Sequence, residues 1–377
     1  MKTDFLIIGT GFYGAVIGER ISKILNKKVL FLEKRNHIGG NCYSEVDNST
    51  KIEYHKYGSH IFHTSNQKVW DYINLFTTFN NYKHQVLTSH KNKVYQMPIN
   101  LETINSFFKK NLSPSEAEKF IKSEAKKEGI KNPKNFEEKA KSIIGRKLYN
   151  AFIKNYTEKQ WGISPKNLPA SIFNRLPIKF SYQEDYFNHC LYQGIPTNGY
   201  TEIFKKLLSS KNIKIKLNTD YFNLKDKIKV KYLTIYTGPV DKFFDYKHGK
   251  LAWRSVKFKN KIINKNDFQG TSVMNYADKK NKFTRIHEPK HLHLERKYTS
   301  NKSLIIEEYA LNDPLNPYYP INNSENRIIL QKYKSDIKKT RNVVFGGRLA
   351  DYAYYDMDMT ISAALTKFAN IKKKLDI

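Results

Sequence analysis

The sequence predicts an α/β fold in which a nucleotide-binding domain is discontinuous, with other modules inserted between its pieces. The first observation is an N-terminal βαβ pattern: an apolar run at residues 5–8, a glycine turn, a helical stretch at residues 15–25 and a second apolar run at residues 29–32. The second observation is that two later apolar runs, at residues 233–236 and 343–345, also end in glycine turns. This repeated pattern indicates that distant segments contribute to one domain.

The glycine turn at residues 9–14 has the spacing G-x-G-x-x-G. Gly9 permits a tight turn, Gly11 lets the backbone approach a pyrophosphate, and Gly14 lets the helix pack closely on the strand. The helix N-terminus then faces the phosphates. Glu33 lies 19 residues beyond Gly14, where an acid hydrogen-bonds the ribose hydroxyls. The unit therefore predicts a Rossmann-like domain that binds a dinucleotide.

The residues after Glu33 favour FAD over NAD. An acidic strand end followed within about six residues by Gly39 and Gly40 resembles flavoproteins with two dinucleotide-binding motifs. The late strand at residues 343–345 with its Gly-Gly-Arg turn fits as well, since those flavoproteins close the site with a C-terminal strand and glycine turn near the flavin ring.

The middle of the chain predicts a helical insertion and a set of strands. Residues 101–148 carry apolar side chains at three- and four-residue spacing, and the Ser-Pro-Ser-Glu run at residues 113–116 is typical of a helix start. Residues 149–196 are dense in aromatic residues, Arg and Pro without clean periodicity, which predicts loops and strand segments near a site. Residues 255–284 and 302–309 alternate as strands do. Further helices are expected at residues 200–208 and 359–371.

The totals limit the class of protein. A length of 377 residues predicts two or three domains. The net charge of +31 attracts anions, but the lysines are spread along the chain and no nucleic-acid module is visible, so we expect no nucleic-acid partner. Cys42 and Cys190 form neither a disulfide framework nor a zinc motif. With no apolar run of about 18 residues, we expect a cytoplasmic protein without an integral membrane segment.

Longer motifs resemble those of the UDP-galactopyranose mutase family. The run YGSHIFHT at residues 57–64 looks like the histidine loop of that family. Similar blocks stand in the expected order up to about residue 365, so the resemblance covers nearly the whole chain. They are NYTEKQWG at residues 155–162, YQGIP at residues 192–196, YTGPVD at residues 236–241, and GRL with YYDM at residues 347–349 and 354–357.

The resemblance implies an isomerase that interconverts UDP-galactopyranose and UDP-galactofuranose and supplies galactofuranose for cell-surface glycans. FAD must be reduced although no net redox change occurs, because flavin N5 is the nucleophile toward the anomeric carbon. The family also implies a homodimer, a UDP-sugar substrate and an external flavin reductant or NAD(P)H.

The resemblance, together with the glycine motif, selects site residues. Arg175, Arg285 and His60 are expected to be catalytic, the two arginines by holding the diphosphate. Tyr156 is expected to stack on uracil and Trp161 to close over the substrate. The residues expected at the cofactor are Gly9, Gly11, Tyr13, Gly14, Glu33, Lys34, Gly40, Asn41, His60, Ile61, Tyr221, Thr237, Gly238, Arg348, Tyr354, Asp356 and Met357. Those expected at the substrate are His84, Phe152, Tyr156, Thr157, Trp161, Arg175, Tyr186, Asn275, Arg285, Tyr319 and Tyr354.

Alternatives remain open at the sequence level. His84 departs from the family pattern, which has Asn beside the sugar, so the same chemistry on UDP-N-acetylgalactosamine is an alternative. A flavin oxidase of the amine-oxidase type shares the FAD module, but a diphosphate and uracil site has no use in it. No His and carboxylate pair stands out at metal spacing, so no metal is expected.

The domain division follows from these segments. We expect a discontinuous FAD-binding domain, a helical domain that carries the mobile substrate loop, and an antiparallel sheet domain for the substrate. Their respective boundaries are residues 1–65, 197–245 and 340–377; residues 100–170; and residues 66–99, 171–196 and 246–339.

Overall fold

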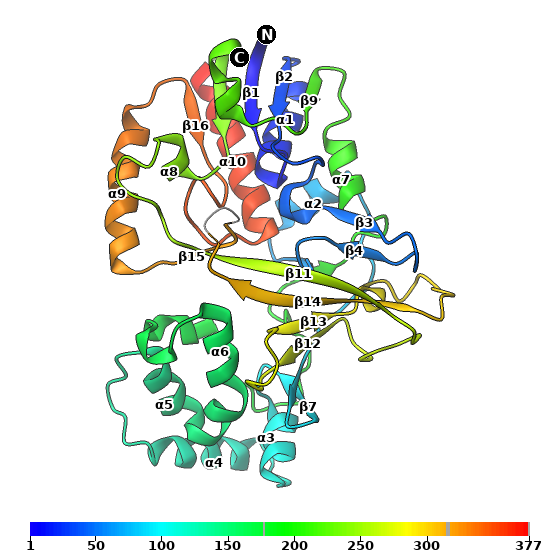
Figure 1. Ribbon diagram of the computed structural model, residues 1–377, viewed down its shortest axis with the longest axis vertical. Helices are drawn as coiled ribbons and strands as arrows, with labels where there is room; N and C mark the ends of the chain where they lie inside the picture. The colour runs from blue at the N-terminus through cyan, green and yellow to red at the C-terminus, as the bar shows by residue number, and fades with distance from the viewer. Residues whose placement is uncertain (176–177, 314–316, 376–377) are drawn as a thin grey trace.

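A five-stranded parallel sheet forms one end of the molecule in the computed structural model, which describes residues 1–175, 178–313 and 317–375 (Figure 1). Its strand order is β16-β10-β1-β2-β9, and every neighbouring pair is parallel. The strands come from three separate parts of the chain, which confirms the predicted discontinuous α/β fold. They are β1 (Lys2–Ile8), β2 (Val29–Leu32), β9 (Ile213–Lys216), β10 (Lys229–Tyr236) and β16 (Val343–Phe345).

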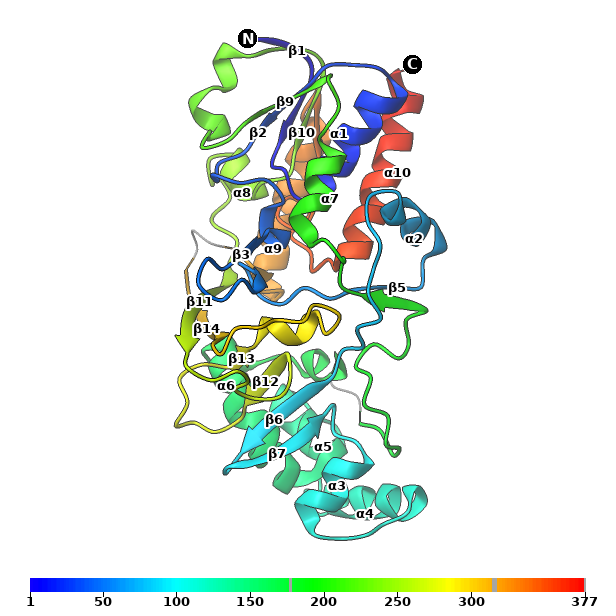
Figure 2. The same cartoon turned by 90° about the vertical axis from the view of Figure 1, so that its right-hand side faces the viewer.

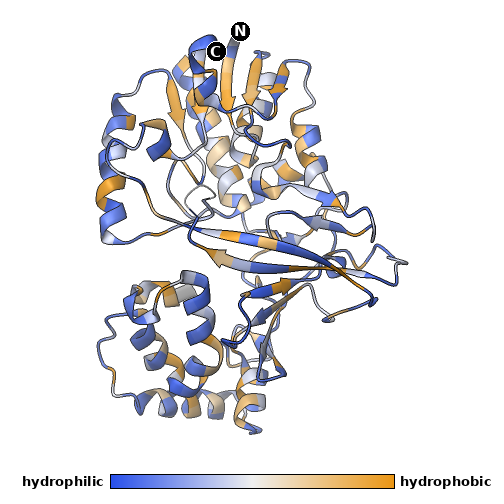
Figure 3. Cartoon of the chain, in the orientation of Figure 1, coloured by the Kyte–Doolittle hydropathy of each residue, from blue (hydrophilic) through white to orange (hydrophobic). Residues whose placement is uncertain are grey.

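Helices cover both faces of this sheet. Along β1, Phe5 and Ile7 join the core with α1 (Phe12–Ile24), α7 (Tyr200–Leu207) and α10 (Met357–Leu375). Leu6 joins a separate cluster on the opposite face, as expected from the alternation of side chains along a strand. Tyr333 of α9 (Ser324–Lys339) packs there beside α8 (Val240–Phe243). Figure 3 shows the strands of this sheet as mainly hydrophobic.

A seven-stranded sheet crosses the middle of the molecule (Figures 1 and 2). Its order is β15-β11-β14-β13-β12-β6-β7, and its pairs are antiparallel except β12 with β6, which is parallel. That pair cannot be a hairpin because the helical insertion separates its two strands in the chain. The strands are β6 (Val86–His90), β7 (Lys93–Met97), β11 (Trp253–Ile263), β12 (Val273–Tyr276), β13 (Arg285–His287), β14 (Ser303–Leu311) and β15 (Tyr319–Pro320).

Short elements connect the two sheets. Two small antiparallel pairs join β3 (Ser44–Val46) to β4 (Glu53–His55) and β5 (Phe62–Thr64) to β8 (Tyr192–Gly194), with α2 (Gln67–Asn74) after β5. The short 3₁₀ helices are η1 (Gly40–Cys42), η3 (Pro165–Asn167), η4 (Ala170–Arg175), η5 (Tyr221–Asn223), η6 (Lys225–Lys227) and η7 (Pro289–Leu292).

The helical insertion forms the other end of the molecule (Figure 1). It has its own apolar core and consists of α3 (Leu101–Phe108), α4 (Pro114–Lys126), α5 (Phe136–Leu148), the π-helix η2 (Tyr149–Ile153) and α6 (Lys154–Trp161). The expected start of α4 is confirmed, because Ser113 and Glu116 form a capping box. The expectation of loops and strands from residue 149 is wrong for residues 149–161, which are helical. The π turn of η2 shifts the spacing of apolar residues away from the α-helical period.

The division into three domains stays a prediction. Helix α9 lies in the segment expected for the sheet domain, yet Tyr333 packs with Tyr236 and Phe345 of the five-stranded sheet. Within residues 1–175, 178–313 and 317–375, no helix is long and apolar enough to cross a membrane.

Candidate active site

The glycine turn between β1 and α1 lies at the carboxyl edge of the parallel sheet, where ligands of such folds bind. Gly9 has φ +96°, and a Cβ there would collide with the Thr237 hydroxyl. A Cβ on Gly14 would collide with the Gly9 carbonyl oxygen. At Gly11, by contrast, the first atom that a Cβ would meet is Cα of Gly40, 3.9 Å away. The space in front of Gly11 is therefore open, as the pyrophosphate of a dinucleotide requires.

Glu33 is held at the end of β2. Its Oε2 accepts hydrogen bonds from the Thr10 backbone N–H (3.0 Å) and hydroxyl (2.8 Å), and its Oε1 accepts one from the Arg35 N–H (3.0 Å). The carboxylate is buried, but Oε1, which accepts only one hydrogen bond, keeps acceptor capacity for a ribose hydroxyl. Lys34, the next residue, is exposed.

Arg35 belongs to the cofactor region, although the sequence analysis selected only its neighbour Lys34. Arg35 Nη2 donates to Asn41 Oδ1 (2.9 Å), and the guanidinium lies 4.3 Å from the centroid of the Tyr57 ring. Arg35 Nη1 is buried and has no hydrogen-bond partner among the described residues. A buried donor of this kind normally has an acceptor, and a phosphate oxygen of FAD suits an arginine best.

Other residues expected at the cofactor line the same sheet edge. Thr237, after β10, donates from Oγ1 to the Ile8 carbonyl (2.6 Å), and Gly238 follows it. The Tyr221 ring packs beside Ile8 and lies parallel to the Phe243 ring, with the two ring centroids 6.5 Å apart. Arg348 follows β16 at the next position along the edge.

The histidine loop holds His60 as a neutral ring. His60 Nδ1 lies 2.6 Å from the Gly58 carbonyl oxygen, which only accepts, so this nitrogen carries the proton. Burial, and then the positive charge of Arg348, lower the pKa of His60 to about 4. Its Nε2 is therefore a hydrogen-bond acceptor at neutral pH. Ile61 is buried beside it with Ile195 and Leu292.

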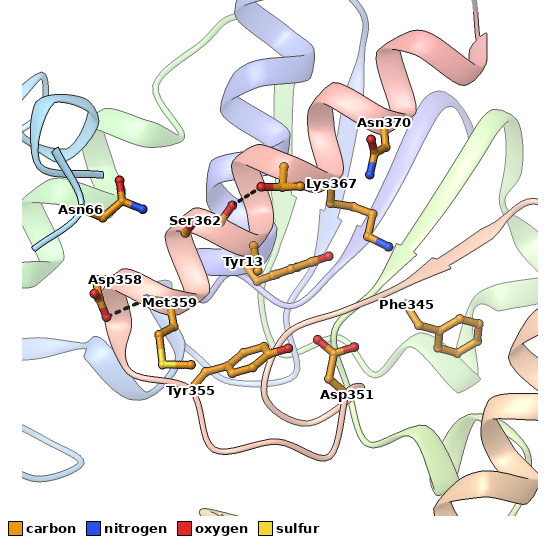
Figure 4. Close-up of a pocket in the computed structure, with 12 residues that line it drawn as sticks. Tyr13, Asn66, Phe345, Asp351, Tyr355, Asp358, Met359, Ser362, Lys367 and Asn370 are labelled. Carbon is orange, nitrogen blue, oxygen red and sulfur yellow. Dashed lines mark hydrogen bonds between the residues drawn. The ribbon is translucent and has the colours of Figure 1, made fainter. Parts of the chain in front are cut away.

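Tyr13 lies apart from the chemistry. Its ring packs so closely on Gly346 that a Cβ there would collide with the Tyr13 hydroxyl. The ring lines a cavity of about 630 Å³ with Asp351 and Tyr355 from the loop before α10 (Figure 4). This cavity includes neither His60 nor any residue expected at the substrate. Tyr13 is in the first turn of α1, so we expect its backbone N–H, and not its ring, to contact the cofactor.

Asp356 and Met357 lie at the start of α10. Met357 is the first residue of that helix, and the Asp356 carbonyl accepts from the Thr360 N–H (3.0 Å). Tyr354 precedes them and stacks on Tyr319 of β15, with ring centroids 5.7 Å apart. The C-terminal block is thus brought against the seven-stranded sheet.

Arg285 on β13 is the centre of the expected substrate residues. Its Nη2 and Nε donate to the Tyr156 hydroxyl at 2.6 and 3.2 Å. Burial works against its charge, but Glu308 and Tyr156 raise the pKa of Arg285 well above its usual value. Its side chain keeps 32% of its surface exposed, so the guanidinium can also meet a ligand. Asn275 is its partner across β12 and β13, and Asn275 Oδ1 is buried without a partner among the described residues.

The other expected substrate residues of the helical insertion lie on η2 and α6. Phe152 is buried in a ring cluster with Tyr95 and Phe107, and Thr157 is buried beside Tyr156. Trp161 ends α6 and packs against the helical core. Arg175 is the last residue of η4, and its side chain lies outside the described part of the structure.

His84 is buried next to Tyr186. The Tyr186 N–H donates to the His84 carbonyl (2.8 Å), and the rings meet edge to face at 5.8 Å. His84 Nδ1 lies 3.0 Å from the Tyr82 hydroxyl. Burial first, then Arg285 and His287, lower the pKa of His84 to about 3. The ring is therefore neutral, which suits a sugar hydroxyl better than a phosphate.

An ion pair and two hydrogen bonds, which were not predicted from the sequence, join Arg285 to the histidine loop. Glu308 lies 3.6 Å from Arg285 and accepts from His287 Nε2 (2.9 Å). The Ser59 hydroxyl donates to His287 Nδ1 (2.8 Å), one residue before His60. Burial alone would raise the pKa of Glu308, but Arg285 and His287 lower it. The sequence signal that could have revealed these contacts is the pair Glu307 and Glu308 in the mainly apolar strand β14. A carboxylate buried in such a strand requires hydrogen-bond or ion-pair partners.

The two neutral histidines predict acid sensitivity. Both rings have an ordinary pKa of 6.5, and in the folded chain that of His60 is about 4 and that of His84 about 3. Between those values and 6.5 the unfolded chain binds more protons, so stability is lost as the pH falls through that window, by about 1.4 kcal/mol for each unit of pKa difference. Thermal unfolding from pH 8 to pH 4 should show a steep fall in Tm below pH 6.5. In His84→Asn the fall should be shallower, whatever its Tm at pH 8, and an equal slope in both proteins would contradict this account.

One group of possible metal ligands lies away from this site. Ligand atoms of Asp267, Glu288 and His291 lie within 4.8 Å of one another. Glu288 already accepts from the N–H groups of Phe268 and Gln269, and His291 pairs with both acids. The arrangement is satisfied by the protein's own groups.

Comparison with known proteins identifies the family. The family model described as UDP-galactopyranose mutase matches residues 151–354, and one described as an NAD(P)-binding Rossmann-like domain matches residues 7–76. A Klebsiella pneumoniae protein named probable UDP-galactopyranose mutase is 40% identical over 364 residues, covering 96% of this chain and 93% of its own. An Escherichia coli protein named dTDP-fucopyranose mutase is 38% identical over 366 residues, covering 96% of both chains.

Solved structures agree on the fold. A crystal structure of reduced UDP-galactopyranose mutase has a TM-score of 0.76 at 14% identity and covers 99% of this chain and 96% of its own. A putrescine oxidase has a TM-score of 0.56 at 10% identity, with 99% of each chain covered, so the fold extends to flavin oxidases too. The family model and the sequence relatives match the mutases and so distinguish this chain from the oxidases. The chain belongs to the UDP-galactopyranose mutase family: it is an enzyme of the isomerase class, and the dinucleotide for which its glycine turn is built is FAD.

Proposed function

We propose that this enzyme interconverts the pyranose and furanose forms of a nucleoside-diphosphate hexose, with UDP-galactose as the expected substrate. The proposal follows from the family, whose relatives cover nearly the whole chain. The observation that carries it is the partly exposed Arg285 guanidinium beside Tyr156. A fixed cation beside an aromatic ring suits a diphosphate attached to a base, whereas an amine substrate has no use for it.

The chain's own residues bind, orient and stabilise charge. Arg285 and Arg175 are proposed to hold the diphosphate and to stabilise the negative charge that develops on it when the bond to the sugar breaks. Tyr156 is proposed to stack on the base, and Tyr319 and Tyr354 to donate to the phosphates. Reduced FAD, when bound, supplies a nucleophilic nitrogen for the anomeric carbon.

His60 and Arg348 are proposed to form the protein side of the flavin site. Neutral His60 offers an acceptor at Nε2, while the nearby Arg348 offers a positive charge to an electron-rich ring. His60 stays neutral in this role at neutral pH, because its pKa is lowered to about 4. The pairing supports a cofactor that works in its reduced form.

The identity of the nucleotide and of the sugar is the finer part of the proposal. The two relatives named above carry different substrate names at nearly equal identity, so dTDP-fucose joins UDP-galactose and UDP-N-acetylgalactosamine as a candidate. His84 departs from the family pattern and lies buried beside Tyr186. We propose that His84 contributes to the choice of sugar through its neutral ring.

The test is an assay of the reduced holoenzyme. The protein is purified with FAD, reduced anaerobically with dithionite and incubated in parallel with UDP-galactofuranose, UDP-N-acetylgalactosamine and dTDP-fucose. Conversion of at least one nucleotide sugar to its other ring form, measured by chromatography, is the expected result. The oxidised enzyme serves as the matched control and should be inactive.

Two results of this assay test the mutase function and the role of His84 separately. Absence of interconversion for all three substrates under reducing conditions would refute the mutase function. A changed ratio of kcat/KM between the galactose and N-acetylgalactosamine substrates in His84→Asn would support the role of His84, and an unchanged ratio would remove it. A homodimer, a cytoplasmic location and a nicotinamide reductant stay predictions.

A further inference from the structure

Lys159 makes an unusual set of contacts on α6. Its ammonium lies within hydrogen-bond distance of four backbone carbonyls, those of Tyr276 (2.6 Å), Asp278 (3.2 Å), Asn281 (3.1 Å) and Phe283 (3.0 Å), so its three N–H groups are shared among them. All four belong to the end of β12 or to the turn before β13. One lysine of the helical insertion therefore occupies the turn that connects two strands of the seven-stranded sheet.

That turn separates two residues of the proposed substrate site. Asn275 lies just before it on β12, and Arg285 lies just after it on β13. Tyr156 is three residues before Lys159 on α6, and its hydroxyl accepts from Arg285. The Lys159 contacts thus join the helix that carries Tyr156 to the turn that sets Asn275 and Arg285.

A second cation contacts α6 at the residue next to Lys159, at the C-terminal end of the helix. Arg254 on β11 is buried and donates from Nε to the Gln160 carbonyl (3.0 Å), one of the last in the helix. Gly162 follows with φ +70°, and a Cβ there would press against the Arg254 guanidinium. A cation at a helix C-terminus satisfies carbonyls that lack an intrahelical partner. Helix α6 is therefore held to the sheet at two points.

The turn is anchored on its far side as well. Asp278 accepts from His90 Nδ1 (2.7 Å) and from the Lys91 N–H (2.9 Å), which ties it to the hairpin of β6 and β7. Burial lowers the pKa of Lys159 to about 8, while Asp278 acts in the opposite direction. The four carbonyl dipoles also favour the ammonium over the amine. A partly buried charge with all its donors used is a fixed element, unlike the exposed lysines elsewhere on the chain.

We propose that Lys159 is a positioning residue that docks α6 on the β12–β13 turn and thereby sets Tyr156 against Arg285 for binding of a nucleoside diphosphate. This inference rests on the proposed function for the chemistry of the ligand. The docking of the helix itself rests only on the contacts.

The test compares Lys159→Met with Lys154→Met in the oxidised FAD-bound protein. Lys154 is the first residue of the same helix, so the control loses a lysine from α6 without touching the β12–β13 turn. Hydrogen exchange of the α6 amides, measured without ligand, should accelerate about tenfold in Lys159→Met and stay unchanged in the control. The Kd for UDP, measured by calorimetry, should rise about tenfold or more in Lys159→Met alone.

A double-mutant cycle tests whether the effect passes through Tyr156. In the Lys159→Met background, Tyr156→Ala should weaken UDP binding less than it does in the parent protein, because contacts that act together are not additive. Additive effects of the two substitutions on the Kd, or an unchanged Kd with faster exchange, would overturn the positioning role. Lys159 would then only stabilise the attachment of α6 to the sheet. Unchanged exchange in α6 would overturn the docking itself. Failure of the parent protein to bind either UDP or dTDP would instead count against the proposed function, and the exchange experiment would still decide the docking.

Discussion

Replacing Arg285 by alanine is expected to lower kcat/KM of the reduced enzyme by about 100- to 1000-fold while FAD remains bound. Arg285 donates two hydrogen bonds to Tyr156 and keeps 32% of its side chain exposed, so the alanine variant loses both the cation for the diphosphate and the anchor of the ring. Steady-state kinetics with the active nucleotide sugar, together with visible absorbance of the flavin, measure the two parts of this expectation.

Matched variants separate charge from geometry. Arg285→Lys keeps the charge but loses the planar fork, and it should recover only part of the activity. Removing Arg285 takes away the ion-pair partner of the buried Glu308 and leaves it the hydrogen bond from His287, so Tm should be measured alongside. An alanine variant with full activity would remove Arg285 from the site, and one that loses its flavin would assign Arg285 a structural role.

Replacing Gly14 by alanine is expected to abolish FAD binding and to lower stability by about 1–3 kcal/mol, the range for overpacked sites. The added Cβ would collide with the Gly9 carbonyl oxygen and lie 3.1 Å from Cγ2 of Ile7, so α1 would have to move away from β1. That movement displaces the helix N-terminus from the phosphates. Thermal unfolding of the apoprotein and titration with FAD measure the two losses.

Gly11→Ala is the informative partner of that variant. Its Cβ would meet nothing closer than 3.9 Å, and its φ of −67° suits any residue, so the apoprotein should keep its stability. The methyl group would nevertheless occupy the space expected for the pyrophosphate, so FAD affinity should fall. An equal loss of apoprotein stability in Gly11→Ala and Gly14→Ala would contradict the different roles assigned to these two glycines.

The parts of the fold that the sequence could predict are those with local signals. The glycine turn, the strands β2 and β16 and the capping box of α4 were all visible in short windows. Helix α9 was not predicted, because its apolar residues, Ile329, Leu330, Tyr333 and Ile337, are few in a largely polar segment. The π-helix η2 was missed since its period differs from that of an α-helix.

The candidate site divides in the same way. His60 and Tyr156 stand in blocks that resemble those of the family, and Arg285 was selected by the same resemblance. Lys159 stands in one of those blocks and Arg35 follows the selected Lys34, but the importance of both depends on burial and on partners from distant segments. Such pairings arise only when the chain folds, so no spacing along the sequence reveals them.

The order of strands in the parallel sheet has a consequence for biosynthesis. Its central strand β1 pairs on one side with β2, which is close to it in the chain, but on the other side with β10 from residue 229, and β16 joins β10 only at residue 343. Contacts this far apart form late, whereas the helical insertion at residues 101–161 contains mostly local contacts and can form early. In a nascent chain the edge of β1 that faces β10 therefore stays unpaired until residue 236 has been made, and the sheet gains its last strand only with residues 343–345.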